Sequence, residues 1–352
     1  MDKDRATQLR TFPVLQREGL GLIDTGARDG IQPLFHEIAP LLCVVGFEPD
    51  AEECERLTRA VTEGRYMTET YLPYALGATD GPALLHLCRS RGTSSLYPPH
   101  RALLNRFPDA DRFDVIETRA IPVKSLDRLL VETTHAFPPS IDFLKLDTQG
   151  SELDVLRGAQ ETLQRYVIGV QVEVEFSRLY ESQPLFRDVD AFLAERGFTL
   201  FKLRRAGWVR QGYRTWPHLS AGQVMFADAL YLRDPLDPEV VGAYHWSAHQ
   251  AEALLVVAVL YDLCDFALEL LDDARFAALV DVGSVQRYLQ WRQLVLERSG
   301  WSSGWWSLAG HVLRTCLRGS SGLRRLEAWH RRRWWHRADS DLDFYTVVLG
   351  ER

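Results

Sequence analysis

The sequence predicts an α/β fold with a mostly parallel sheet, an antiparallel edge and a mainly helical C-terminal extension. Short apolar runs alternate with stretches of helical spacing through the first two thirds of the chain, which is typical of a parallel sheet covered on both faces. The run at residues 43–48 is almost continuously apolar, as expected of a buried parallel strand. The predicted strands are residues 20–24, 43–48, 71–76, 141–147, 167–175, 199–203 and 225–232, with helices at 49–63, 151–163 and 183–196.

The last two predicted strands, 199–203 and 225–232, depart from this alternation. Only a polar stretch containing Arg and Gly separates them, so we expect an antiparallel hairpin at the edge of the sheet. The Pro-containing segment 234–238 that follows indicates a linker or a domain boundary. Beyond it, helices are predicted at 249–272, 274–280 and 285–297, and a strand at 344–349. We therefore divide the chain into a lead-in helix or strand at 1–20, an α/β domain at 21–235 and a helical extension at 236–352.

Composition narrows the function classes. A formal net charge of -7 over 352 residues argues against a general nucleic-acid binder, which needs surplus Lys and Arg to neutralise phosphates. The five cysteines form no CxxC pair, so we expect reduced thiols and a cytoplasmic location. The most apolar stretch, residues 253–261, is far shorter than the ~20 residues that span a bilayer, so no transmembrane segment is expected.

The first predicted strand ends in an acid and a small-residue turn, Asp24-Thr25-Gly26-Ala27-Arg28-Asp29-Gly30. A dinucleotide-binding turn prefers the spacing G-x-G-x-x-G, which cradles a pyrophosphate. An acid at this position repels a pyrophosphate and suits an ammonium or sulfonium group, and S-adenosylmethionine carries both. The alternative is a strand–turn–helix whose glycines serve packing only.

The second predicted strand ends at Glu48, followed by Pro49 and Asp50. A carboxylate at the end of this strand can accept hydrogen bonds from both ribose hydroxyls. Pro49 suits the first position of the next helix, so Glu48 is alternatively a helix N-cap. The two interpretations are compatible.

A third acid-terminated strand contains Lys145 and Asp147, which period two places on one side of the strand. A Lys–Asp pair at the carboxyl end of a sheet is costly unless it is used or satisfied. One interpretation is a buried ion pair that anchors the neighbouring loop. The other is a polar floor beneath a reacting methyl group.

These motifs together resemble the FkbM family of S-adenosylmethionine-dependent methyltransferases. The family carries a D-x-G-A-x-x-G loop, an F-E-P turn and a phrase close to IDFLKxDxQGxExxVLxGA, which residues 141–159 match as IDFLKLDTQGSELDVLRGA. The resemblance spans about residues 20–233. It implies a class I methyltransferase (Rossmann-like) fold at 21–235 and methylation of hydroxyl oxygens on sugars or natural products. The cofactor-binding residues that we expect are Asp24, Gly26, Ala27, Gly30, Glu48, Pro49 and Leu76.

One departure from the family pattern lies in the first turn, where Arg28 replaces a more usual Asn. Arg28 could pair with the methionine carboxylate of the cofactor or point outward. No family phrase has a counterpart beyond about residue 235.

Methyl transfer to an alcohol benefits from a base within hydrogen-bond reach of the acceptor. Asp147 is the best candidate, and Lys145 and Glu175 are the other catalytic candidates. Asp147, Glu173 and Glu175 could supply oxygen ligands to Mg²⁺, but no spacing singles out a metal site and none is indicated. His36, His86 and His100 are more simply ordinary loop or surface histidines. The polar loop 91–99 either borders the acceptor pocket or is a solvated turn.

The C-terminal extension mixes indoles and cations, above all in residues 329–337, WHRRRWWHR. Trp and Arg together favour a protein partner or an anionic membrane surface; the alternative is a helix with packed Trp and solvated Arg side chains. For the whole chain we expect an O-methyltransferase acting on a glycan or a small natural-product metabolite. The alternatives are a non-catalytic S-adenosylmethionine-binding module or scaffold and, on weaker grounds, a nicotinamide-dependent oxidoreductase.

Overall fold

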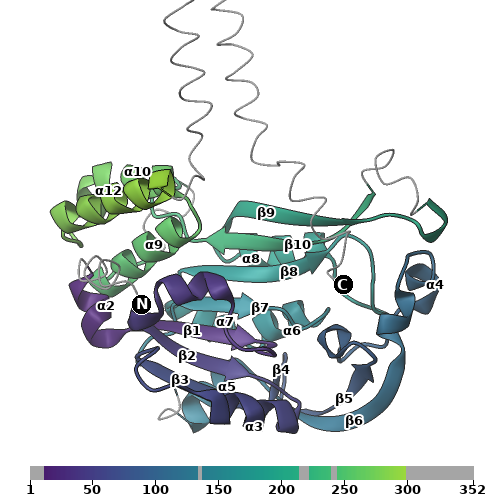
Figure 1. The fold of residues 1–352 in the computed structure, drawn as a ribbon. Helices are drawn as coiled ribbons and strands as arrows, with labels where there is room; N and C mark the ends of the chain where they lie inside the picture. The colour runs from purple at the N-terminus through teal and green to yellow at the C-terminus, as the bar shows by residue number, and fades with distance from the viewer. Residues whose placement is uncertain (1–11, 134–136, 214–221, 239–243, 299–352) are drawn as a thin grey trace, which may run out of the picture.

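The computed structural model describes residues 12–133, 137–213, 222–238 and 244–298. Its main sheet has seven strands in the order β3-β2-β1-β7-β8-β10-β9 (Figure 1). All of its pairs are parallel except those of β10, which runs antiparallel to both β8 and β9. The strands are β1 (Leu20–Thr25), β2 (Leu42–Phe47), β3 (Thr68–Leu72), β7 (Phe143–Leu146), β8 (Gly169–Glu175), β9 (Thr199–Trp208) and β10 (Gln223–Leu232). The predicted mostly parallel sheet with an antiparallel hairpin at its edge is confirmed.

The predicted strand at 71–76 is wrong as a single element. It contains the end of β3 and all of β4 (Ala75–Leu76), which belong to different sheets. Pro73 lies between them and lacks the N–H that would continue a ladder. The second sheet has the order β4-β6-β5, with β5 (Gly81–Cys88) antiparallel to β6 (Val115–Lys124). Sequence patterning missed both long strands because each contains a proline and much of β6 is exposed.

Helices cover both faces of the main sheet. On one face, a core cluster unites apolar side chains of β1, β2, β7, β8 and β10 with the intervening helices. The predicted helix at 151–163 is two helices, which are separated at Gly158 and Ala159. Gly158 packs against the Gly77 carbonyl so closely that a Cβ on Gly158 would lie 2.0 Å from the Gly77 oxygen. The helices of this cluster are α5 (Leu126–Glu132), α6 (Glu152–Arg157), α7 (Gln160–Arg165) and α8 (Phe186–Ala194). The helix α3 (Ala51–Ala60) packs instead through Cys54 and Leu57 against Ala27 and Tyr71, in a separate small cluster.

The other face is covered by α2 (Pro13–Glu18) and by helices from the C-terminal region. Residues 33–41, between β1 and β2, form only two short 3-10 turns, and α9 (Ala248–Leu260) lies on the sheet in the same cluster (Figure 1). Every residue from 250 to 260 is buried, which explains a helix that is apolar on nearly all sides. The α/β core is therefore continuous with α9.

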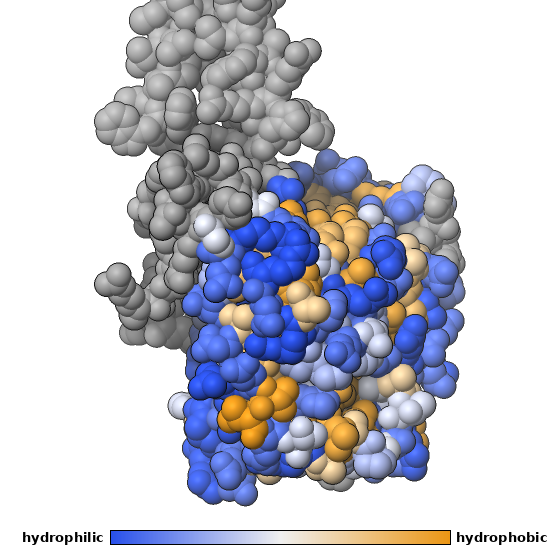
Figure 2. Space-filling view, turned by 90° about the vertical axis from the view of Figure 1, so that its right-hand side faces the viewer, coloured by the Kyte–Doolittle hydropathy of each residue, from blue (hydrophilic) through white to orange (hydrophobic). Residues whose placement is uncertain are grey.

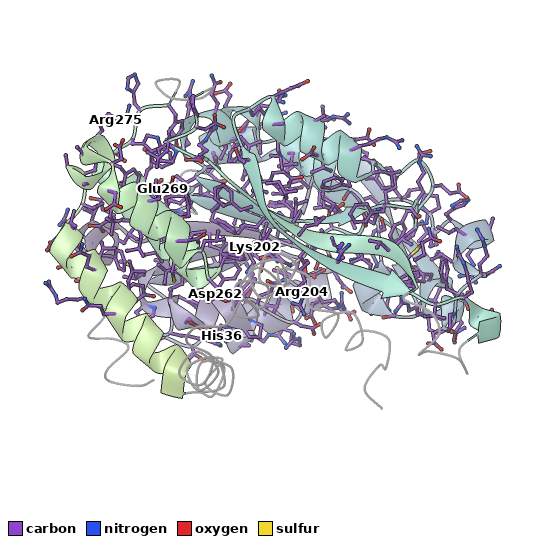
Figure 3. All side chains as sticks on the ribbon, turned by 90° about the horizontal axis from the view of Figure 1, so that it is seen from above. His36, Lys202, Arg204, Asp262, Glu269 and Arg275 are labelled. Atoms are coloured by element: carbon purple, nitrogen blue, oxygen red, sulfur yellow. The ribbon has the colours of Figure 1, made fainter. Side chains whose placement is uncertain are left out.

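Polar contacts hold α9 at both ends. Near its start, the His249 ring contacts Glu18 at 3.1 Å and Asp142 at 3.0 Å, and a Glu252 carboxylate oxygen accepts the free N–H groups of the first turn of α2. At its end, Lys202 of β9 donates to the Tyr261 carbonyl at 2.9 Å. Figure 3 shows Lys202 beside Asp262, in the turn after α9.

The predicted helix at 249–272 is interrupted at Asp262, which has a left-handed φ of 59°. It becomes α9 and α10 (Cys264–Asp272), followed by α11 (Ala274–Ala277) and α12 (Val282–Arg298). Within the described ranges, no helix combines the length and apolarity needed to cross a membrane. The predicted strand at 344–349 and the Trp/Arg stretch lie outside the described residues.

Leu254 tests whether α9 stabilises the α/β core. Its side chain is fully buried, so Leu254→Ala should lower the free energy of unfolding by about 2–5 kcal/mol. Leu268 on α10 is 49% exposed, so the matched Leu268→Ala change should stay within about 1 kcal/mol. Chemical denaturation of both variants measures the difference. Equal small losses would mean that α9 is not part of the cooperative core.

Candidate functional site

A cleft opens at the carboxyl edge of the main sheet, where β1, β2 and β7 end. Gly26, Glu48 and Asp147 line it from these strand ends, and the second sheet and its loops form the opposite wall. Figure 2 looks onto this side of the molecule and shows a mainly hydrophilic surface broken by separate hydrophobic patches. In a sheet of this kind, ligands bind at this edge.

The turn after β1 brings its backbone close to β2 and β7. Gly26 has a φ of 76°, and the N–H groups of Gly26 and Ala27 both donate to the Phe47 carbonyl at 3.1 Å. A Cβ on Gly26 would lie 2.0 Å from the backbone oxygen of Asp147, so only glycine fits. Ala27 is buried in a small apolar cluster, and Gly30 closes the turn with a bond to the Ala27 carbonyl. Gly26 therefore lines the cleft, whereas Ala27 and Gly30 shape the turn behind it.

The Glu48 side chain is 5% exposed and lies in the cleft wall. Its Oε1 accepts the Asp50 N–H at 2.9 Å. Burial raises the pKa of Glu48, while the Asp50 N–H and the Arg28 guanidinium oppose that rise. The helix α3 begins at Ala51 with Asp50 as its N-cap, so the expected helix start at Pro49 is wrong. Pro49 precedes the helix and lines the cleft beside Glu48.

Arg28 does not point outward. Its guanidinium lies 3.8 Å from Glu48 Oε1 and 3.8 Å from Asp50 Oδ2. Arg119 of β6 contacts the other Asp50 oxygen at 3.5 Å. Arg28 thus lies among the carboxylates that follow β2, with its positive charge already balanced.

Lys145 lies between two acids at the ends of β1 and β7. Its Nζ is 3.2 Å from Asp24 Oδ1 and 3.6 Å from Asp147 Oδ2. Asp24 is fully buried and does not line the cleft, and Lys145 is its charged partner. Burial outweighs the attraction of Lys145 and raises the pKa of Asp24 to about 6. Burial disfavours the charge on Lys145, but the surrounding carboxylates outweigh it and raise the pKa of Lys145.

Gln149 organises the neighbourhood of Asp147, a role that sequence reasoning missed. Its Nε2 donates to Asp147 Oδ1 and to Glu173 Oε1, both at 2.9 Å. Its Oε1 accepts the Tyr180 hydroxyl at 3.0 Å, and its backbone oxygen accepts the Ser95 hydroxyl at 2.7 Å. Gln149 has a φ of 57°, a conformation that a sequence motif does not reveal. Asp147 itself lines the cleft, with 34% of its side chain exposed.

The other acids of this region lie behind the cleft. Glu175 is buried and does not line it, and burial raises the pKa of both Glu173 and Glu175 well above the ordinary value. The Glu152 carboxylate accepts the N–H groups of Thr148 at 2.7 Å and Gly150 at 3.0 Å, and burial raises its pKa to about 7. Among the described residues, no group of three or more His, Cys, Asp or Glu side chains is arranged to hold a metal ion.

The predicted loop at 91–99 does border the cleft. Residues 91, 92 and 94–96 line it, together with the apolar Leu76, Leu85 and Leu87 from the second sheet. His36 bonds to the Ile31 carbonyl and Arg65, and His100 bonds to the Arg178 carbonyl. Neither these two histidines nor His86 lines the cleft, so none is placed to act as a base there.

A larger hollow of about 1000 Å³ lies between the α/β domain and the C-terminal helices. It is lined by Arg196, Arg233, Trp246 and Phe276 among others, and it adjoins the end of the antiparallel β10. That end is the amino edge of the parallel strands, opposite the edge where such sheets bind ligands. Arg233 is also fully engaged, donating to the Val167, Arg196 and Leu163 carbonyls. The smaller cleft is therefore the candidate site.

Comparison with protein families shows to which family the chain belongs. The model of the methyltransferase FkbM domain matches residues 24–200, which contain the end of β1, the cleft residues and the whole of β2, β3, β7 and β8. The chain belongs to the FkbM methyltransferase family. The strand order with an antiparallel β10 is that of the class I methyltransferase fold, as the sequence resemblance implied. No curated protein sequence matches the chain.

Solved structures with distant similarity include methyltransferase FkbM from Methylobacillus flagellatus KT, with 14% identity and a TM-score of 0.34 over 61% of this chain and 44% of that one. The alignment thus spans less than half of the Methylobacillus protein. Magnesium protoporphyrin IX methyltransferase (ChlM) from Synechocystis PCC 6803, with bound SAM, has 10% identity and a TM-score of 0.30 over 65% and 79% of the two chains. The N-terminal domain of EvdMO1, with SAH bound, has 10% identity and a TM-score of 0.30 over 66% and 82%.

The ion pair beneath the cleft can be tested by stability. Lys145→Met removes the cation that faces Asp24 and should lower the free energy of unfolding by about 3–5 kcal/mol, because a buried carboxylate is left uncompensated. The double variant Lys145→Met/Asp24→Asn should recover part of that loss. Chemical denaturation of the single and double variants gives the coupling energy. Strictly additive losses would show that the two side chains do not interact.

Proposed function

We propose that this protein is an S-adenosylmethionine-dependent O-methyltransferase acting on a hydroxyl group of a glycan or a small natural-product metabolite. The observation that supports it most is the convergence of Glu48, Gly26 and Asp147 on one cleft, from the ends of three adjacent parallel strands. Membership of a methyltransferase family rests on the family match. The cofactor, the acceptor and the roles of the residues are what we propose.

The residues of the cleft fit this cofactor. Glu48 presents a buried carboxylate beside the turn, suited to a ribose diol. Leu76 and Pro49 give apolar contact nearby, and Gly26, backed by Ala27 and Gly30, lets the ligand approach the backbone closely. Asp24 acts from behind the turn through its charge, which favours the ammonium and sulfonium groups. When bound, S-adenosylmethionine supplies an electrophilic methyl group.

The chain's own task in the reaction is to align the acceptor and to take its proton. Asp147 lines the cleft together with the loop 91–96, which is bonded to Gln149 through Ser95. Gln149 and Lys145 hold the two carboxylate oxygens of Asp147 in place. We assign Asp147 as the base that accepts the hydroxyl proton. Lys145 positions Asp147, and Glu175, the third catalytic candidate from the sequence, lies buried behind the cleft, where burial disfavours its charge.

The acceptor class rests on the family resemblance and on the mixed apolar and polar wall of the cleft. The four cysteines in the described part of the chain are free thiols, which supports the proposed cytoplasmic location. The acidic net charge of -7 supports a small-molecule or glycan acceptor over nucleic acid. A protein or membrane contact through the C-terminal Trp/Arg stretch remains a proposal from sequence.

The ribose-binding role of Glu48 predicts a loss of cofactor affinity. Glu48→Gln keeps the shape of the side chain but removes its charge and one acceptor, so S-adenosylhomocysteine should bind about 10–100-fold more weakly. Isothermal titration calorimetry measures this, with the exposed Glu55 changed to Gln as the matched control. Unaltered affinity in Glu48→Gln would remove Glu48 from the site.

The function itself is tested by incubating the protein with radiolabelled S-adenosylmethionine and a panel of glycans and hydroxylated metabolites. Asp147→Asn should then lower turnover about 100-fold or more while S-adenosylhomocysteine affinity changes little, because the proposed base acts on the acceptor. Tight cofactor binding without transfer to any acceptor would favour the non-catalytic module. Normal turnover in Asp147→Asn would exclude Asp147 as the base.

A further inference from the structure

Two cations line the cleft, Arg28 and Arg91, and they differ in their partners. Arg28 faces Glu48 and Asp50. Arg91 makes no ion pair with any described residue, and its buried NH1 has no hydrogen-bond partner there. Leaving a guanidinium nitrogen shielded from water and without an acceptor costs free energy. An anionic group bound beside Arg91 would remove that cost.

Hydrogen bonds fix the end of the cleft at which Arg91 lies. Arg91 begins the short turn Arg91–Thr93 that follows β5. The Tyr180 hydroxyl shares its one proton between the Thr93 carbonyl at 2.8 Å and Gln149 Oε1 at 3.0 Å, and the Ser95 hydroxyl donates to the Gln149 carbonyl at 2.7 Å. These bonds tie the turn to residues that follow β7 and β8. Arg91 is thus at the Asp147 end of the cleft, across β1 from the end occupied by Glu48.

We propose that Arg91 is the anion-recognising residue of the cleft and pairs with a carboxylate or phosphate group of a bound ligand. The inference rests on the proposed function, because the Asp147 end is where the amino-acid part of the cofactor and the acceptor would meet. The anionic group is either the α-carboxylate of the cofactor or an acidic substituent of the acceptor. A planar guanidinium can grip either group with two parallel hydrogen bonds.

The cofactor source is tested with two ligands that share the adenosine part. S-adenosylhomocysteine carries the α-carboxylate, and 5′-methylthioadenosine lacks the amino-acid moiety. If Arg91 binds that carboxylate, Arg91→Gln should weaken S-adenosylhomocysteine about 10-fold or more and leave 5′-methylthioadenosine within about 2-fold. Arg91→Lys, which keeps the charge, should lose less. Isothermal titration calorimetry on the full chain gives both affinities.

The acceptor source is tested with inorganic phosphate, titrated into protein saturated with S-adenosylhomocysteine. Saturable phosphate binding in the wild type that disappears in Arg91→Gln would support an acidic acceptor. Arg89→Gln is the matched control, because Arg89 is 61% exposed, pairs with Asp114 and does not line the cleft. Arg28→Gln should weaken both adenosine ligands alike, through Glu48.

The outcomes separate this inference from the proposed function. Two results for Arg91→Gln would overturn the inference. In the first, phosphate binding and the affinity ratio of the two adenosine ligands are both unchanged. In the second, both adenosine ligands bind equally more weakly and phosphate binding is unaffected. Failure of the wild type to bind either adenosine ligand would refute the proposed cofactor instead. The phosphate titration, run then without S-adenosylhomocysteine, would still decide whether Arg91 holds an anion.

Discussion

The site depends on Lys145, the cation that joins the ends of β1 and β7. Three parallel strands that end in or beside acids bring negative charge to one edge of the sheet, and burial makes that charge expensive. Lys145 offsets part of this cost by lying within 4 Å of both Asp24 and Asp147. Burial raises the pKa of Asp24, while the surrounding carboxylates raise that of Lys145.

The remaining polar groups at this edge are of two kinds: some line the cleft, and others hold the cleft-lining groups in place. Glu48, Gly26 and Asp147 line the cleft. Gln149 bridges Asp147 and Glu173 and connects them to Tyr180 and Ser95. This network sets the distance between the main sheet and the loop of the second sheet, so the two walls of the cleft form one hydrogen-bonded unit. Lys145 and Gln149 hold Asp147 directly, and Gln149 is in turn bonded to Glu173, Tyr180 and Ser95.

The C-terminal helices have a structural part in the same molecule. The segment between β1 and β2 offers only short 3-10 turns, and α9 fills the apolar face that a longer helix there would cover. His249 and Glu252 fasten α9 to Asp142 and α2. The region that the sequence presented as an extension thus shares its first helix with the core of the α/β domain.

Local patterns were sufficient for much of this. Apolar runs ending at Asp24, Glu48 and Asp147 predicted three parallel strands and the sheet edge at which the candidate site lies, because side-chain period and strand direction are local properties. The family phrase at 141–159 predicted the fold that the strand order shows. Only the tertiary structure decided that Asp24 lies behind the cleft, that Arg28 pairs with Glu48 and Asp50, and that Gln149 and Arg91 belong to the site. Each of these facts depends on which segments, far apart in sequence, pack against one another. A local sequence pattern does not encode such packing.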